Sequence, residues 1–378
     1  MNRIILVFLI FSTTLFSQSQ KLDSLITVGI HQIYSIKFDE AEATFSLIQK
    51  KYPMHPAGKF FDAMIVWWKV LLELRSEVYD DLMRSKLELS LEQCEDILDE
   101  NPNNVDAIFF KGGALGYRGR LDAIRENWLD AAADGKDALP LVLKAYELDS
   151  TNTDVILGFG IYNYYAEVIP EKFPIVEPLM FFFPKGDKKK GIEQLNYVAD
   201  NGKYAKYEAL YFLMTLNYSF ENNQNEALKY AERLCKEFPD NPRFQSYLGR
   251  INIRRNDYSK ATEIFLDIIE KYDLGYTGYS DRIKREALYY VGVNYKQMNN
   301  FTLAEKYFLN CETLSRIVDK EEETGFLANT LLYLGELNDI KGNREYALKY
   351  YKEVLNLTEF QNSHEKGKRY IKTPYSKN

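Results

Sequence analysis

Three arginines in the second half of the chain are spaced so that they share one face of a helix. Arg243, Arg250 and Arg254 stand at positions i, i+7 and i+11, which bring side chains to the same side of an α-helix. Guanidinium groups hold carboxylate oxygens in pairs. The row therefore suits an extended peptide with carboxylates or an acidic glycan. The competing interpretation is that these arginines pair with neighbouring acids such as Glu286.

Residues for catalysis do not gather in this sequence. His31, His55 and His364 are the only histidines and lie far apart, and the chain contains no H-E-x-x-H or G-x-S-x-G motif. No pair of acidic residues stands out as a general acid and base. We predict no catalytic residues, no metal site and no cofactor, and we expect a non-enzymatic protein.

The cysteines and a row of glycines have structural interpretations. Cys94, Cys235 and Cys311 lack C-x-x-C spacing, so we interpret them as packed thiols. Four glycines follow one another at close-packing spacing along a predicted helix, and the first falls where a repeat needs a small residue. They are Gly112, Gly113, Gly116 and Gly119.

Small residues recur at intervals that predict stacked helical repeats. Ala227 and Ala261 are 34 residues apart, and Ala261, Ala304 and Ala347 follow at steps of 43. A large apolar residue stands four positions after most of these alanines. Asn-Asp at 256–257, Asn-Asn at 299–300 and Gly-Asn at 342–343 are turn pairs where two helices of one repeat should meet. A period of this size is typical of helix pairs that bury their apolar faces against one another.

Five segments in this register resemble tetratricopeptide repeats. They are 22–55, 208–241, 242–275, 285–318 and 328–361, with Gly29, Gly249, Gly292 and Gly335 on first helices and Phe45, Phe265, Phe308 and Tyr351 on second helices. The resemblance implies an all-α, right-handed superhelix of about eight antiparallel helix pairs. It further implies a concave groove, lined by first helices, that binds a protein or peptide.

The family's groove positions can be transferred to this chain. The ligand-groove hypothesis takes in Arg243, Arg250, Arg254, Phe212, Phe220, Tyr289 and Lys296.

The middle of the chain, residues 56–207, departs from the 34-residue unit. Segments 59–75 and 121–133 are apolar at helical spacing and predict lengthened or added helices. Pro140 is expected early in a helix, after a break at Gly135. The region from about 150 to 235 also resembles a eukaryotic tetratricopeptide family of the mitochondrial outer membrane linked to inclusion-body clearance, which implies a protein-handling scaffold.

A proline-rich and aromatic insert occupies residues 169–186. Four prolines within 170–184 exclude a continuous helix. Asp187 is a predicted N-cap for a helix over 188–200. Phe181, Phe182 and Phe183 are expected to fill a gap between repeats. The alternative is that they contact a partner or a bilayer surface, beside Lys185 and Lys188–Lys190.

The two ends of the chain have their own signals. Arg3, the apolar run Ile4–Phe11 and the small polar residues after it predict a cleaved signal peptide over 1–19, and hence a periplasmic or secreted protein. An uncleaved N-terminal anchor is the alternative. Residues 362–378 are rich in lysine and are expected to be a disordered basic tail.

Composition and repeats together favour an exported interaction scaffold over residues 20–361. The formal net charge of −7 disfavours nucleic acid as a ligand. Membrane contact is the less favoured role for the insert. Carbohydrate binding in the cell envelope is an alternative, because 29 tyrosines and 23 phenylalanines offer stacking surfaces. An enzyme with a site in the irregular region 105–190 is a further alternative, which a deep pocket with converging polar groups would favour.

Overall fold

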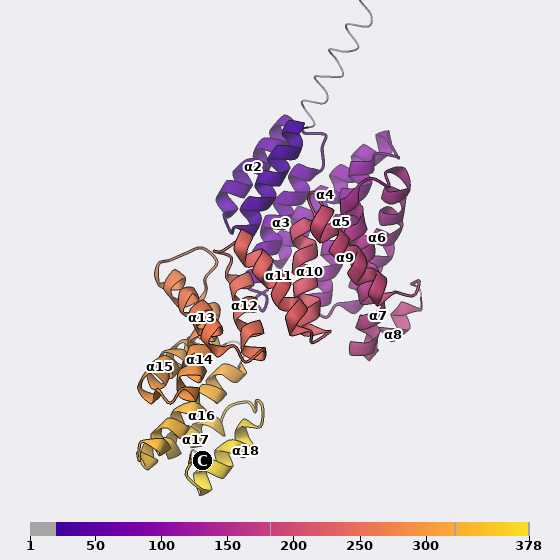
Figure 1. The fold of residues 1–378 in the computed structure, drawn as a ribbon. Helices are drawn as coiled ribbons and strands as arrows, with labels where there is room; N and C mark the ends of the chain where they lie inside the picture. Colours follow the sequence, from indigo (N-terminus) through magenta and orange to yellow (C-terminus); the bar gives the residue numbers. More distant parts are fainter. Residues whose placement is uncertain (1–19, 182, 321–322, 377–378) are drawn as a thin grey trace, which may run out of the picture. The chain divides into compact units, whose positions relative to one another are not determined.

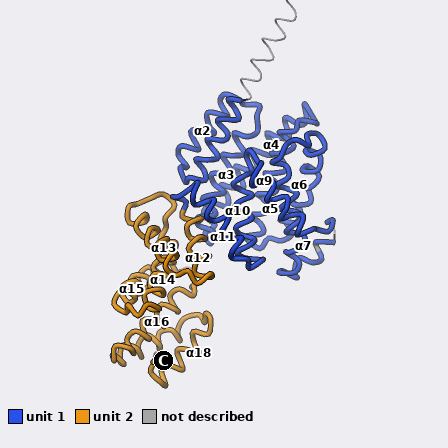
Figure 2. The backbone as a smooth tube through the Cα atoms, viewed as in Figure 1, with its two compact units in different colours: residues 1–241 blue, residues 242–378 orange. Residues whose placement is uncertain are grey.

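A computed structural model describes residues 20–181, 183–320 and 323–376 of the chain. These residues form helices, turns and loops, with no strand among them. The chain divides into two compact units, residues 1–241 and 242–378 (Figure 2). The repeat pattern did not predict this division, since it continues without a break from one unit to the next.

Unit 1 begins with a helix over residues 20–34. Its other helices are α2 (Phe38–Lys51), α3 (Ala57–Leu72), α4 (Asp80–Glu100), α5 (Val105–Ile124), α6 (Trp128–Leu148), α7 (Ile156–Lys172), α8 (Glu177–Met180), α9 (Lys188–Asn201), α10 (Lys206–Ser219) and α11 (Gln224–Glu237), with short 3-10 turns η1 (Thr153–Val155) and η2 (Pro174–Val176) (Figure 1).

Unit 2 contains three helix pairs and a last helix. They are α12 (Pro242–Arg254), α13 (Tyr258–Asp273), α14 (Asp281–Gln297), α15 (Phe301–Val318), α16 (Gly325–Ile340), α17 (Arg344–Val354) and α18 (Ser363–Lys372). Each of these helices packs on the next within its pair, as the repeat pattern predicts.

The glycine of the repeat makes room for an aromatic ring sixteen residues later. A side-chain carbon added at the glycine would lie 2.3 to 2.7 Å from that ring, and every one of the four rings is fully buried. The pairs are Gly29 with Phe45, Gly249 with Phe265, Gly292 with Phe308, and Gly335 with Tyr351. Four of the five predicted repeats are therefore helix pairs in which a small residue on the first helix accommodates a large one from the second.

The turns between paired helices also lie where the sequence places them. Asn256, Asn299 and Gly342 have positive φ angles of 62°, 61° and 79°. The next residue caps the second helix in two cases, since Asp257 and Asn300 accept hydrogen bonds from the backbone of Lys260 and Leu303. Asp187 caps α9 in the same way through Lys190, as predicted.

Unit 1 closes on itself. Tyr34, at the end of the first helix, donates a hydrogen bond of 2.7 Å to Glu208 in α10, and its backbone carbonyl accepts one from Asn241. The ring of Tyr34 also contacts Trp68 of α3 and Phe238 after α11. The first and last helix pairs of the unit therefore lie side by side, which an open array of repeats does not require.

The middle helices are long, as expected, but their boundaries differ from the prediction. α4, α5 and α6 have 21, 20 and 21 residues. The segment 121–133 is not one helix, because Glu126 takes a φ of 62° and a turn separates α5 from α6. Gly135 and Pro140 both lie inside α6, so the predicted break at Gly135 is wrong. Close packing of α5 along α6 maintains that helix across both residues.

The basic tail contains a packed helix, which corrects the expectation of disorder for residues 363–372. Tyr370 of α18 is buried against Tyr351, with ring centroids 5.4 Å apart. Arg344 donates hydrogen bonds of 2.7 Å to the carbonyls of Tyr370 and Ile371 and so holds the end of α18.

Candidate functional site

Unit 1 contains a cavity of about 660 Å³ that is open to solvent on one side. It is lined by the first helix of each pair, namely residues 20–34, α3, α5, α7 and α10, by one face of α6, and by residues of η1 and of the loops beside α7 and α10. The second helices α2, α4, α9 and α11 contribute no lining residue. Sites that enclose a small molecule span roughly 300–1,000 Å³. The first helices thus face a common interior, as the repeat resemblance implies for a groove, and closure of unit 1 makes that interior a pocket.

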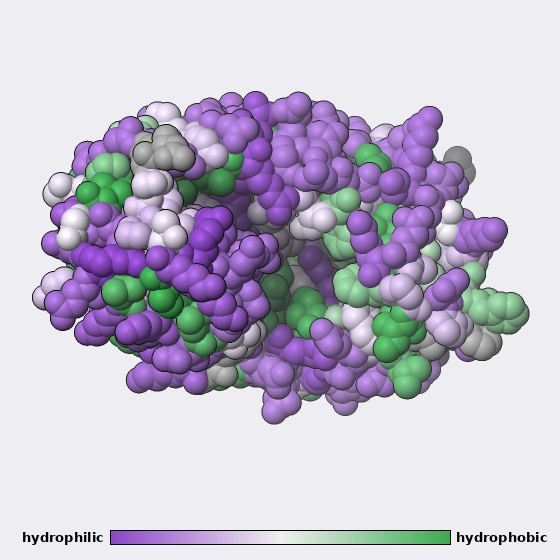
Figure 3. Space-filling view, turned by 90° about the horizontal axis from the view of Figure 1, so that it is seen from below, coloured by the Kyte–Doolittle hydropathy of each residue, from purple (hydrophilic) through white to green (hydrophobic). Residues whose placement is uncertain are grey.

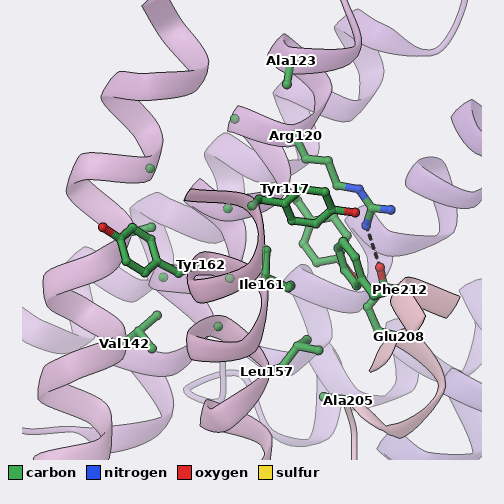
Figure 4. A pocket seen from close by; sticks show the side chains of 18 of the residues that line it. Tyr117, Arg120, Ala123, Val142, Leu157, Ile161, Tyr162, Ala205, Glu208 and Phe212 are labelled. Atoms are coloured by element: carbon green, nitrogen blue, oxygen red, sulfur yellow. Dashed lines mark hydrogen bonds and ion pairs between the residues drawn. The ribbon is translucent and has the colours of Figure 1, made fainter. Parts of the chain in front are cut away.

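The cavity wall is mainly aromatic and aliphatic. Figure 4 shows Val142, Leu157, Ile161 and Phe212 around the space. All three tryptophans of the chain, Trp67, Trp68 and Trp128, belong to the wall.

α7 explains why this space exists. Its sequence is apolar on most sides, yet only Gly160, Tyr164 and Val168 are buried. Several of its other apolar side chains, Leu157 and Ile161 among them, line the cavity. A helix that is apolar all round needs cover on every side.

The glycine row of α5 has two roles. A side-chain carbon at Gly112 or Gly119 would meet α6 at 3.4 or 3.1 Å, so these two glycines bring the helices together as predicted. All four glycines line the cavity, but Gly116 differs because no atom lies within 4 Å of such a carbon. Spacing alone could not distinguish the glycine that faces the open interior from those that face a neighbouring helix.

A polar cluster stands on the wall formed by α5 and α10. Arg120 donates to Glu208 over 2.6 Å, and Tyr34 donates to the other oxygen of the same carboxylate over 2.7 Å. Figure 4 shows the Tyr117 ring beside this pair. The guanidinium of Arg120 also lies over the rings of Trp67 and Phe212, 4.8 and 4.4 Å from their centroids.

These contacts fix the charge states of the cluster. Burial by itself would lower the pKa of Arg120, but the Glu208 carboxylate raises it above its usual value. Burial and the same carboxylate hold the pKa values of the Tyr34 and Tyr117 hydroxyls well above their usual range. Arg120 therefore stays cationic and both tyrosines stay protonated, so the cation and the carboxylate cancel.

The cavity lining lacks several of the side chains that act most often as nucleophiles. The described residues that line the cavity include no serine, threonine, cysteine, histidine or lysine. Asp154, another lining residue, accepts hydrogen bonds from the backbone of Lys203, Tyr204 and Ala205. Its carboxylate thereby joins η1 to the loop between α9 and α10. Among the described residues, no cluster of histidine, cysteine and acidic side chains could hold a metal ion.

Two residues of the predicted groove belong to this cavity. Phe212 and Phe220 both line it, and each contacts the ring of Tyr165, at centroid distances of 6.0 and 5.8 Å. The sequence did not identify Arg120, Glu208 or Tyr117 as site residues. A signal for Arg120 was present, because it follows the glycine row in α5 by a single residue.

The other five groove candidates lie in unit 2. Arg250 forms a two-pronged ion pair with Glu286, with distances of 2.5 and 3.1 Å, as the competing interpretation proposed. Arg254 is exposed, and Arg243 lies over the ring of Tyr247.

Lys296 and Tyr289 are engaged within unit 2. Lys296 pairs with the buried Glu336 over 2.6 Å. Tyr289 packs against Phe326, with ring centroids 5.2 Å apart. The charges of Arg250 and Lys296 are thus each matched by an acid of the same unit.

The three phenylalanines of the insert do not share one environment. Phe181 is 86% exposed, whereas Phe183 is half-buried and lines the cavity. Phe182 lies outside the described residues.

No family model and no curated protein matches this sequence. Solved structures with a similar succession of helices include pilF of Pseudomonas aeruginosa, at 14% identity and a TM-score of 0.44, over 68% of this chain and 96% of that one. A human IFIT1 dimer with PPP-AAAA has 14% identity and a TM-score of 0.41, over 85% and 69%. A tetratricopeptide repeat protein from Parabacteroides merdae has 15% identity and a TM-score of 0.36, over 79% and 96%. These similarities concern the fold alone.

Proposed function

We propose that this helical-repeat scaffold is a non-catalytic binding protein whose unit 1 encloses the apolar part of a ligand. The observation that carries the proposal is a cavity of about 660 Å³ walled by aromatic and aliphatic side chains. A ligand that buries about ten methylene groups there gains about 8 kcal/mol, from which the entropy of association is subtracted. The cancelled charges of Arg120 and Glu208 favour a ligand whose buried part is neutral.

The same wall disfavours the two alternatives. A sugar carries many hydroxyls that need partners, and the cavity offers few polar groups beyond Arg120, Glu208 and its tyrosines. An enzyme in region 105–190 would need a nucleophile or an available acid or base. Arg120, Glu208 and Tyr34 bond to one another instead, and Asp154 accepts hydrogen bonds from three backbone N–H groups.

The chain carries its own reporters for a binding test, because its three tryptophans line the cavity. N-phenylnaphthylamine is a neutral apolar fluorophore that accepts energy from tryptophan. We expect saturable binding to the wild type, seen as tryptophan quenching and probe emission. Gly116→Leu places a side chain in the cavity and should weaken binding at least tenfold, whereas Gly116→Ala should bind as the wild type does.

Two results would overturn the proposal. One is the absence of saturable probe binding by the folded wild type. The other is equal binding by wild type and Gly116→Leu, with both proteins unfolding at the same temperature.

Unit 2 supports a second candidate function, the binding of a partner polypeptide. Arg254 is exposed on α12, and Arg243 lies on the same helix over Tyr247. A segment with acidic residues would complement this surface. Arg243→Glu with Arg254→Glu should reduce capture of a polyglutamate peptide. Lys260→Glu, an exposed control on α13, should leave capture unchanged. Equal capture by all three proteins would exclude this surface.

Export stays a proposal that rests on sequence, since residues 1–19 lie outside the described part of the chain. No helix in the described part is both long and apolar enough to span a bilayer. Cleavage near Ser17 or Ser19 predicts a mature protein that begins close to Gln20. N-terminal sequencing of protein recovered from outside the inner membrane tests this, and retention of Met1 would contradict cleavage.

A further inference from the structure

One edge of the cavity is apolar on its inner and its outer side. This edge, here called the lip, consists of Trp128 and Leu129 at the start of α6 together with residues 173–181. Four of its side chains line the cavity: Trp128, Phe173, Val176 and Met180. Trp128 and Phe173 contact each other with ring centroids 5.4 Å apart, which joins the two segments into one structure.

The outer side of the lip exposes large apolar side chains to solvent. Phe181, Ile175 and Leu129 are 86%, 73% and 72% exposed. Single exposed residues of this kind are ordinary, but here three come from one short structure that also forms a cavity wall. Figure 1 shows α8 at an edge of unit 1, and Figure 3 shows apolar residues gathered at the corresponding right-hand end of the surface.

The prolines explain why these side chains are not folded inward. Pro174 begins η2 and Pro178 lies within α8, so the chain forms short helical turns and cannot continue α7. Val176 is buried and anchors the segment. Because Val176 is buried between two short helical turns, its neighbour Ile175 lies on the opposite, solvent-exposed side of the segment.

Basic side chains border the lip. Lys172, Lys185, Lys189 and Lys190 are exposed, Lys189 at 90%. Two nearby acids are engaged locally, because Asp187 caps α9 and Glu167 accepts the backbone N–H of Lys188. Glu171 and Glu177 are exposed beside the lysines, and Lys189 lies 4.0 Å from Glu193. Exposed lysines around an apolar surface complement anionic lipid headgroups.

We propose that the lip docks on a bilayer surface that contains anionic phospholipid, and that a lipid hydrocarbon chain enters the cavity there. This inference rests on the function proposed for unit 1 and names its ligand. Phe181, Ile175 and Leu129 insert at the level of the headgroups while the lysines contact lipid phosphates. The lipid hydrocarbon chain then moves from the apolar interior of the bilayer to the apolar wall of the cavity. Its methylene groups therefore stay out of water during transfer.

Vesicle flotation tests the docking step. Wild-type protein should float with vesicles of phosphatidylcholine and phosphatidylglycerol, and much less with phosphatidylcholine alone. Ile175→Asp with Phe181→Asp should reduce flotation at least tenfold. Val78→Asp is the matched control, because Val78 is 71% exposed in unit 1 but lies outside the lip. All three proteins should bind N-phenylnaphthylamine equally, which shows that fold and cavity are intact.

A transfer assay tests the entry step. Vesicles that carry a pyrene-labelled phosphatidylglycerol should lose probe to the wild type, giving energy transfer from the tryptophans to pyrene. Gly116→Leu should still float with vesicles but should extract at least tenfold less lipid. This inference is overturned if the lip variant and Val78→Asp float equally, or if a wild type that binds N-phenylnaphthylamine does not float. Either result leaves the proposed function intact. Failure to bind that fluorophore overturns the proposed function itself.

Discussion

The substitution Gly29→Ala tests the packing rule of the repeat. A side-chain carbon at Gly29 would lie 2.3 Å from Cζ of Phe45, which is closer than side-chain carbons approach one another. Phe45 is fully buried and stacks on Phe61 with centroids 5.4 Å apart, so its ring has little room to move. The clash must therefore be relieved by strain in the core.

Two opposing effects decide the outcome. Alanine in place of glycine stabilises a helix by about 0.5–1 kcal/mol. Overpacking of a core costs about 1–3 kcal/mol. We therefore expect Gly29→Ala to lower the free energy of unfolding by about 0.5–2 kcal/mol. Gly116→Ala is the matched control in the same unit, and it should raise stability by about 0.5–1 kcal/mol because its new carbon meets no atom within 4 Å.

The assay is urea unfolding followed by tryptophan fluorescence, which reports on unit 1 because Trp67, Trp68 and Trp128 all belong to it. Adding Phe45→Leu to Gly29→Ala should cost less than the sum of the two single substitutions, since the smaller side chain relieves the clash. The reasoning is refuted if Gly29→Ala is as stable as the wild type, or if the two substitutions add without coupling.

Three further predictions concern the thiols and unit 2. Burial raises the pKa of Cys94 to about 12 and that of Cys311 to about 11. Up to pH 9, Ellman's reagent should therefore modify only the half-buried Cys235 in native protein. Rapid modification of a second thiol would contradict the packing. Asp319→Asn leaves the buried Arg285 without its carboxylate partner. The substitution should lower the free energy of unfolding of unit 2 by about 3–5 kcal/mol, measured as lost hydrogen-exchange protection in α14–α16. Unchanged protection would show that the ion pair is dispensable. Deletion of residues 362–378 removes Tyr370 from the core and should lower the stability of unit 2 by about 1.5–3 kcal/mol, whereas equal protection of α17 in both proteins would show that α18 is not part of that core.

The features that sequence could predict are those encoded over short distances. The glycine and its aromatic partner are sixteen residues apart, the turn pairs are adjacent, and Asp187 caps the helix that begins at the next residue. The apolar run 59–75 likewise gives α3, which is buried on nearly all sides. For the glycine pairs, the turns and the cap, one helix pair contains the reason for the local structure.

The features that sequence could not predict depend on distant partners. The turn after α5 is stabilised by Asp122, which receives Arg84 from 38 residues away. Closure of unit 1 depends on Tyr34 and Glu208, which are 174 residues apart. The cavity and its polar cluster follow from that closure, so a pattern read one repeat at a time could find Phe212 and Phe220 but not Arg120 or Glu208. The tail was mispredicted because one buried residue per turn, such as Gly367 and Tyr370, gives a weak apolar pattern.

The central claim is that an apolar ligand lies inside unit 1, and crystallography with a heavy-atom label tests it most directly. Crystals of the protein soaked in bromodecane should show an anomalous bromine signal within the space bounded by Gly116, Leu157 and Phe212. That signal should be absent from crystals of Gly116→Leu. Bromine found only at the outer surface, or at the same interior place in both proteins, would contradict the account.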